Sequence, residues 1–353
     1  MSKLALLCGA ALLTGGVLFA VMPEHCPENR SAPQLLMEAA RNPKAVFQAQ
    51  QTSSVVADGQ REDVQARVSR SGESVRFEYT ARPGQPARVV LERPEAVYVF
   101  WPTVKEGWHI PRRPGSNRPV ACLQLCSTNY RWESQPVEGG LLSLTAFRRR
   151  DNRMTRRYWV QPARQVVVGM QSYGSDGQPD SGWKLTAIEF KESLPAELFE
   201  PPTTVRPALE VEHPQSAASL EEAAARVGFT PEIPNWLPEG YQLVELWSEK
   251  VQGRPSVRLV YSDGLETFSL LQARHTGEST GDESLVEVAR SRQMELLQWS
   301  DGQLDYTLMG SVSNQAPREL ARQLVQGETA PVEPERGVLP IWQRGWERLG
   351  SLF

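Results

Sequence analysis

Serine and histidine residues are the first to test for chemistry, because together they could form a hydrolase site. Residues 277–281, Gly-Glu-Ser-Thr-Gly, match the G-x-S-x-G pattern of a nucleophile elbow. Such an elbow lies between a parallel strand and a helix and needs a histidine later in the chain. No histidine follows Ser279. The four histidines are His25, His109, His213 and His275. Because the H-E-x-x-H, Walker A and Rossmann glycine patterns are also missing from the sequence, we expect neither an enzyme nor a cofactor.

The first 30 residues indicate export from the cytoplasm. Lys3 precedes an uncharged run, Leu4 to Pro23, that is rich in Leu, Ala, Gly and Val. Such a run is typical of a signal peptide or of an uncleaved N-terminal membrane anchor. A cut after Ala20 would leave Leu18, which is not a small residue, at the −3 position. We therefore expect a periplasmic or cell-envelope protein, with cleavage and anchoring both open.

The cysteines could form a disulfide or contribute to a metal site. Outside the apolar leader the chain has Cys26, Cys122 and Cys126. Residues four apart lie about 13 Å from each other in an extended strand, so a Cys122–Cys126 disulfide requires a loop or turn. A zinc site would need a fourth ligand, for which His109 is the nearby candidate. Because an oxidising compartment favours disulfides, we expect that bridge and no metal site.

An arginine cluster surrounds a predicted hairpin turn at Asp151-Asn152. Alternation along the two strands would put several guanidinium groups on one exposed face. Arginine matches phosphate and carboxylate well, so lipid phosphate and an acidic protein partner are alternatives to a merely solvated hairpin. An exported chain with a formal net charge of −4 gives no reason to expect nucleic acid. The candidate contacts to anionic groups are Arg148, Arg150 and Arg156.

Apolar side chains alternate with other residues along two predicted strands, at 75–80 and 97–101. Residues two apart lie on the same face of a strand, so each strand has one apolar face. Such a face is typical of an ordinary core, but it could also stay open for an acyl chain. The candidate lipid-binding residues are Phe77, Tyr79, Val97, Val99 and Trp101.

The chain from residue 31 to residue 203 has the pattern of a domain built from an antiparallel sheet. A helix is expected at 34–41, and turn residues separate the strands that follow. No helix long enough for a parallel crossover intervenes, which favours a meander. Further strands are expected at 46–56, 64–69, 87–91, 142–147, 154–160, 165–173 and 183–190.

A second domain is expected at 217–328, after a proline-rich linker at 204–216. Its first helix begins at Ser219, with Glu222 completing a capping box, and ends at Gly228. Six strands follow, at 241–248, 257–262, 265–272, 285–290, 294–300 and 304–309, and then a helix at 317–325. Residues 329–353 form a tether and an amphipathic tail, which could dock on a partner or a membrane or pack back on its own domain. The 353 residues thus hold two domains, and the class is α+β.

Three sequence blocks resemble the RseB/MucB family of extracytoplasmic stress regulators. Residues 228–246 read GFTPEIPNWLPEGYQLVEL, residues 257–272 read VRLVYSDGLETFSLLQ, and residues 156–190 run from RRYWVQPARQ to WKLTAIEF. The resemblance implies a LolA-like curved half-barrel that cradles a lipid, followed by a smaller α+β domain. It implies a regulator that binds a membrane anti-sigma factor and senses lipid or mislocalised lipoprotein. The alternative is a periplasmic lipoprotein or lipid carrier.

Overall fold

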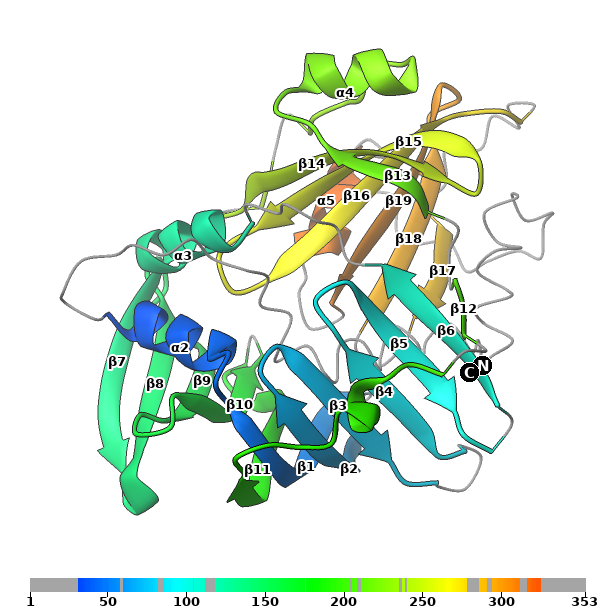
Figure 1. The fold of residues 1–353 in the computed structure, drawn as a ribbon. Helices are drawn as coiled ribbons and strands as arrows, with labels where there is room; N and C mark the ends of the chain where they lie inside the picture. Colours follow the sequence, from blue (N-terminus) through cyan, green and yellow to red (C-terminus); the bar gives the residue numbers. More distant parts are fainter. Residues whose placement is uncertain are drawn as a thin grey trace. The chain divides into compact units, whose positions relative to one another are not determined.

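The computed structural model describes residues 31–324 except for 58–59, 82–85, 104, 112–117, 175, 203–204, 208–210, 235–236, 239, 278–285, 291–293 and 312–315. The predicted leader and the predicted tail lie outside the described residues. The chain divides into two compact units, one with a 12-stranded sheet and one with a 7-stranded sheet (Figure 1). The predicted α+β class, with a large antiparallel sheet before a smaller domain, is confirmed.

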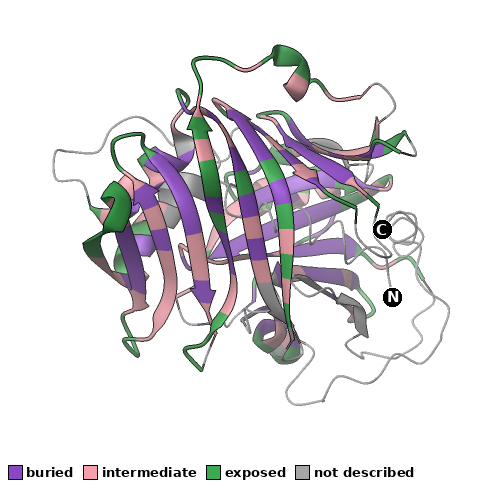
Figure 2. Ribbon diagram, turned by 90° about the horizontal axis from the view of Figure 1, so that it is seen from below, coloured by how far each residue is buried: buried purple, intermediate pink, exposed green. Residues whose placement is uncertain are grey.

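The large sheet is a meander in which almost every strand pairs with its sequence neighbour. Its order is β12-β6-β5-β4-β3-β2-β1-β11-β10-β9-β8-β7, and the short β12 runs parallel to β6 while the other pairs are antiparallel. The elements in this part of the chain are α2 Ala32–Arg41, β1 Val46–Ala57, β2 Gln60–Ser71, β3 Ser74–Tyr79, β4 Arg88–Glu92, β5 Ala96–Trp101, β6 Glu106–Pro111, α3 Arg118–Asn129, β7 Tyr130–Val137, η1 Glu138–Gly140, β8 Leu141–Arg148, β9 Met154–Gln161, β10 Val166–Tyr173, β11 Pro179–Phe190, η2 Ala196–Phe199 and β12 Val205–Pro207. More and less buried residues alternate along several of its strands, such as β3, as expected for a sheet with two different faces (Figure 2).

Helix α2 is capped at its start and attached to the sheet at its end. At its start, the backbone N–H of Ser31 donates to Oε1 of Gln34 at 2.6 Å. At its end, the guanidinium of Arg70 on β2 donates to the carbonyl oxygens of Ala40 at 2.9 Å and Asn42 at 3.2 Å. Burial lowers the pKa of Arg70 to about 10. This buried arginine therefore satisfies carbonyls that the helix leaves without partners.

The second unit is a fully antiparallel sheet with two helices, in the order β13-β14-β15-β16-β19-β18-β17. Ser219 accepts the N–H of Glu222, and Gly228 ends α4 with a φ of 79°, as the sequence predicts. The elements are β13 Val211–Ser216, α4 Leu220–Val227, β14 Gln242–Val251, β15 Arg254–Ser262, β16 Thr267–Arg274, β17 Val286–Arg290, β18 Met294–Ser300, β19 Leu304–Ser311 and α5 Ala316–Leu324.

The proline-rich start of the block at 228–246 is held by one buried glutamine. The side chain of Gln272 on β16 accepts the N–H of Glu232 at 2.8 Å and donates to its carbonyl oxygen at 2.7 Å. The hydroxyl of Tyr306 on β19 contacts Oε2 of the same Glu232 at 2.8 Å. Two of the sequence blocks that define the resemblance, 228–246 and 257–272, are thus joined by direct hydrogen bonds.

Several elements differ from their predictions. The sequence did not predict β6, α3 or β7, and strands β12 and β13 occupy parts of the predicted linker. The hairpin after β15 has four loop residues, 263–266, instead of a two-residue turn at Asp263-Gly264. The side chain of Asp263 explains this longer loop, because its Oδ1 accepts the N–H groups of Leu265 at 2.9 Å and Glu266 at 2.7 Å.

Candidate functional site

The five candidate lipid-binding residues share one face of the large sheet. Phe77 on β3 lies opposite Val90 on β4, which lies opposite Val99 on β5. Directly opposed residues point to the same side, and so do residues two apart on one strand. The shared face therefore carries Phe77, Tyr79, Val97, Val99 and Trp101, and we call it the inner face.

Helix α2 identifies the inner face as the concave one. Arg70, which contacts the end of α2, lies opposite Val75, two residues from Phe77 on the same side of β3. The sheet curves around α2 (Figure 1). The five residues are buried, with exposed fractions between 1% for Phe77 and 8% for Val97.

Three hydrogen-bond donors on the inner face are buried without a partner. They are the hydroxyl of Tyr79 and the indole N–H groups of Trp108 and Trp183, and none has a hydrogen-bond partner among the residues that the structure describes. Trp108 lies opposite Val99, while Trp183 lies opposite Ser53 of β1. An unsatisfied buried polar group costs about 1–3 kcal/mol. The three donors are on β3, β6 and β11, spread across this face of the sheet.

The electrostatics of the inner face keep Tyr79 a donor. Burial raises the pKa of Tyr79, although the nearby Arg88 opposes this shift. The guanidinium of Arg88 lies 4.6 Å from the centre of the Tyr79 ring. The hydroxyl is therefore protonated at neutral pH and able to donate to a ligand oxygen.

Two of the three candidate arginines for anionic contact lie on the inner face, and the third lies in the turn. Arg156 lies opposite Ala146 on the inner face, with Nη1 at 3.4 Å from the hydroxyl of Tyr158. Arg150 is exposed in the turn, 3.8 Å from the carboxylate of Asp151. Arg148 ends β8, two residues beyond Ala146 and so on the same face. Arg148 and Arg156 are half-buried, whereas Arg150 is exposed. Their contact with an anionic partner stays a prediction.

The two candidate disulfide cysteines lie on helix α3, where the sequence analysis required a loop or turn. Cys126 is buried, and its carbonyl oxygen accepts the indole N–H of Trp132 at 3.2 Å. The side chain of Cys122 lies outside the described residues. Side chains four apart on a helix have Cβ atoms about 5–6 Å apart, farther than the about 3.5–4.5 Å of a disulfide. The bridge stays a prediction that requires local opening of the helix.

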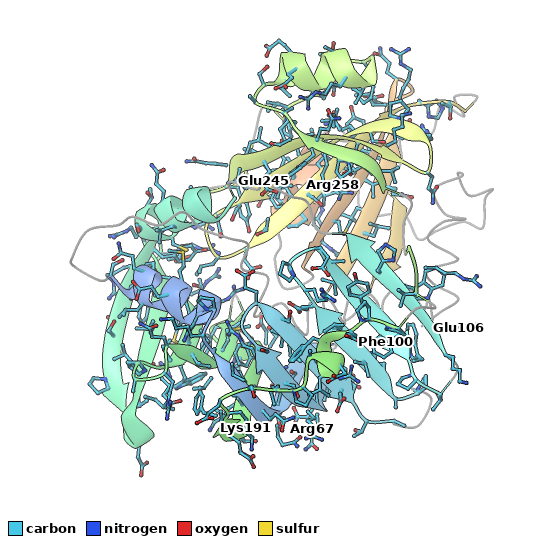
Figure 3. All side chains as sticks on the ribbon, in the orientation of Figure 1. Arg67, Phe100, Glu106, Lys191, Glu245 and Arg258 are labelled. Atoms are coloured by element: carbon cyan, nitrogen blue, oxygen red, sulfur yellow. The ribbon has the colours of Figure 1, made fainter. Side chains whose placement is uncertain are left out.

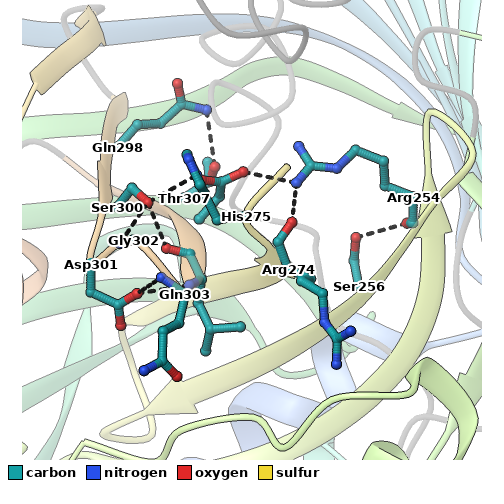
Figure 4. A network of polar contacts seen from close by, with 12 residues as sticks. Arg254, Ser256, Arg274, His275, Gln298, Ser300, Asp301, Gly302, Gln303 and Thr307 are labelled. Atoms are coloured by element: carbon teal, nitrogen blue, oxygen red, sulfur yellow. Dashed lines mark hydrogen bonds and ion pairs between the residues drawn. The ribbon is translucent and has the colours of Figure 1, made fainter. Parts of the chain in front are cut away.

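A serine, a histidine and an aspartate do meet in the second unit (Figure 4). Nδ1 of His275 is 2.6 Å from Oδ1 of Asp305 and 3.1 Å from Oγ of Ser300. A nucleophilic triad needs the acid on one ring nitrogen and the hydroxyl on the other. Because both groups meet the same nitrogen here, this network is not arranged for serine catalysis. Ser279 of the G-x-S-x-G pattern lies outside the described residues.

Metal binding and membrane insertion are two further possibilities for the described part of the chain. In these residues no three His, Cys, Asp or Glu side chains gather closely enough to hold a metal ion. Among the helices described, none is both long and apolar enough to cross a membrane.

Comparisons with known proteins give matches among solved structures. No protein-family model matches the chain, and no curated protein matches it. A crystal structure of MucB in complex with MucA(peri) is 14% identical, covers 82% of this chain and 97% of its own, and has a TM-score of 0.50. The Pseudomonas aeruginosa MucA/MucB complex is 14% identical, with coverage of 85% and 99% and a TM-score of 0.49. A LolA superfamily protein from Nitrosomonas europaea is also 14% identical, covering 49% of this chain and 99% of its own, at a TM-score of 0.27. The predicted resemblance to RseB/MucB proteins is confirmed as a likeness of fold, and this chain has a MucB-like fold across both units.

Proposed function

We propose that this protein is an extracytoplasmic regulatory protein that binds a membrane anti-sigma factor and senses lipid or lipoprotein on its inner face. The MucB-like fold supports the regulatory part, because the match extends over 82% of the chain and so includes both units. MucB itself has been solved with MucA(peri) as its partner. In the alternative, a lipoprotein or lipid carrier, the large sheet would hold the lipid and the second unit would only dock the protein.

The inner face carries the lipid part of the proposal. Its apolar residues supply a surface for an acyl chain, and each of the three buried donors could donate to a carbonyl or ester oxygen. A hydrocarbon without oxygens would leave all three donors unsatisfied. The expected ligand is therefore an acyl ester or acyl amide, as in a lipid or a lipoprotein.

Titration with acyl probes of increasing length tests the lipid part. Each buried CH₂ contributes about 0.8 kcal/mol, so two further carbons should tighten binding by about tenfold or more until the site is full. Phe77→Leu on the inner face should weaken binding. Phe100→Leu is the matched control, because Phe100 lies next in the chain to Val99 and so on the opposite face. Affinity that ignores chain length, or equal loss in both variants, would overturn the proposal.

A pull-down with the extracytoplasmic segment of an anti-sigma factor from the same genome tests the regulatory part. We expect direct binding that changes when an acyl probe is added. Absence of binding at high protein concentration would contradict the regulatory part. Acyl binding without that partner would instead favour the periplasmic lipid or lipoprotein carrier.

A further inference from the structure

A cavity of about 310 Å³ opens at one end of the large sheet, away from the candidates treated above. Three segments that are distant in sequence form it: the connection between α2 and β1, the turn between β9 and β10, and the end of β11. Figure 3 marks one wall, Lys191, directly after β11. The lining residues are Asn42, Lys44, Ala45, Val46, Pro162, Ala163, Arg164, Gln165, Phe190 and Lys191.

The cavity lining is cationic. Lys44, Arg164 and Lys191 each come from a different one of the three segments, and the lining contains no acidic residue. Nζ of Lys191 also contacts Oε2 of Glu189 at 2.7 Å, outside the lining. The hydrogen bond from Lys191 lowers the pKa of Glu189, and Arg67 lowers it further. Glu189 is therefore an exposed carboxylate whose cationic neighbours are Lys191 and Arg67.

Arg164 is held in place at both its backbone and its side chain. Nδ2 of Asn42 donates to the carbonyl oxygen of Arg164 at 2.9 Å. Its guanidinium lies over the ring of Phe190, 4.8 Å from the ring centre, and that ring packs edge-on against Phe47 at 5.9 Å. Stacking uses the flat face of the guanidinium and leaves its N–H edge for a ligand. The arginine fork is therefore preorganised before any ligand arrives.

Backbone contacts fix the other two walls. Oδ1 of Asn42 accepts the N–H of Lys44 at 3.0 Å, so one asparagine ties the first wall to the second. The N–H of Lys191 donates to the carbonyl oxygen of Val46 at 3.0 Å, which ties the third wall to the first. These contacts hold the three segments that carry Lys44, Arg164 and Lys191 around the cavity.

We propose that this cavity binds a phosphate group carried by a small organic molecule. A phosphate monoester carries about −1.5 to −2 charges and three acceptor oxygens, which suits a lining with three cations and no acidic residue better than a single carboxylate does. The cavity is large enough for the phosphate and part of the group that bears it. The site is separate from the inner-face donors and goes beyond the proposed lipid-sensing function, so each can fail without the other.

Titration of the full chain with inorganic phosphate and with glycerol 3-phosphate, followed by calorimetry, tests the proposal. We expect saturable binding that is tighter for the ester. Arg164→Gln should weaken it by about tenfold or more, and Arg164→Lys should restore part of the affinity, because lysine keeps the charge but loses the fork. Lys184→Gln is the control, since Lys184 is exposed on β11 and outside the lining.

Vesicles separate a lipid headgroup from a soluble ester as the source of the phosphate. Flotation with phosphatidylcholine vesicles, with and without phosphatidic acid, is compared for the parent and Arg164→Gln. Binding that depends on both phosphatidic acid and Arg164 identifies a headgroup, while binding of glycerol 3-phosphate without vesicle binding identifies a soluble ester. The proposal is overturned if neither binds saturably, or if Lys184→Gln loses as much affinity as Arg164→Gln while both remain folded by circular dichroism.

Discussion

The hydroxyl of Tyr79 allows a one-atom test of the inner face. Tyr79 is 5% exposed, and its hydroxyl has no hydrogen-bond partner in the described part of the chain. Phenylalanine would keep the ring stacked on Phe77, at 6.5 Å between centroids and 21° between planes. It would also keep the ring under the guanidinium of Arg88. Tyr79→Phe therefore removes the hydroxyl and leaves the packing of the ring in place.

The expected effects on stability and on binding have opposite signs. Because an unsatisfied buried hydroxyl costs about 1–3 kcal/mol, its removal should raise the free energy of unfolding of the ligand-free first unit by about 1 kcal/mol or more. A hydrogen bond from the same hydroxyl to a ligand oxygen would contribute about 0.5–1.5 kcal/mol. Losing it should weaken acyl binding by about 2- to 10-fold. If the hydroxyl does not contact the ligand, Tyr79→Phe should raise the free energy of unfolding and leave acyl affinity unchanged.

Denaturant unfolding and acyl titration of the same variants measure the two effects. Tyr261→Phe in the second unit is the matched control, because Tyr261 is 0% exposed and its hydroxyl also has no partner among the described residues. It should stabilise its unit and leave acyl affinity unchanged. A loss of stability in Tyr79→Phe would show that the hydroxyl is paired and refute the reasoning. An unchanged Kd would remove Tyr79 from the ligand site.

Two further predictions concern the second unit. Gln272→Leu should lower the free energy of unfolding of this unit by about 2–4 kcal/mol, because the backbone of Glu232 loses two hydrogen bonds and gains no replacement. Urea unfolding measures this change, and a loss below about 1 kcal/mol would contradict the prediction. Burial opposes ionisation of Asp301, but hydrogen bonds from the N–H of Leu304 and the hydroxyl of Tyr306 outweigh it and hold its pKa below 3.8. A lowered folded pKa stabilises above the unfolded value and loses that effect as pH falls through the folded value. Asp301→Asn should therefore flatten the fall in stability below about pH 4, and identical pH profiles would count against it.

The strands could be predicted because apolar and polar side chains alternate along each of them. The inner face could not be predicted, because it depends on the register in which the strands pair. The expected strand at 75–80 is β3 at Ser74–Tyr79, one residue away at each end. Alternation placed Phe77 with Tyr79, and Val99 with Trp101, because side chains repeat every two residues. It could not tell whether the two pairs share a side of the sheet. That depends on Val90, which joins Phe77 to Val99 through two registers.

The features that the sequence missed depend on contacts between distant segments. Trp183 and Trp108 carry buried donors, yet nothing near them in the sequence distinguishes them from ordinary strand aromatics. Arg70 looks like any polar residue on a strand until the end of α2 lies beside it. The cationic cavity likewise draws on three segments, 42–46, 162–165 and 190–191. Helix α3 was missed because a proline near its start, at 119, and a short CLQLC run gave no clear helical period.

The distribution of charge on the inner face sets the direction in which an acyl chain could lie. Val75 lies two residues before Phe77 on β3. Its neighbours on the adjacent strands are Arg70 and Glu92, which are both charged. Two residues the other way, Tyr79 lies opposite Arg88. A chain running along a strand would thus meet buried charges on either side, whereas one running across the strands meets a fully apolar row. Neighbouring strands are about 4.8 Å apart, so this six-residue row is about 24 Å long and ends at an indole donor. The row consists of Ala49, Val68, Phe77, Val90, Val99 and Trp108.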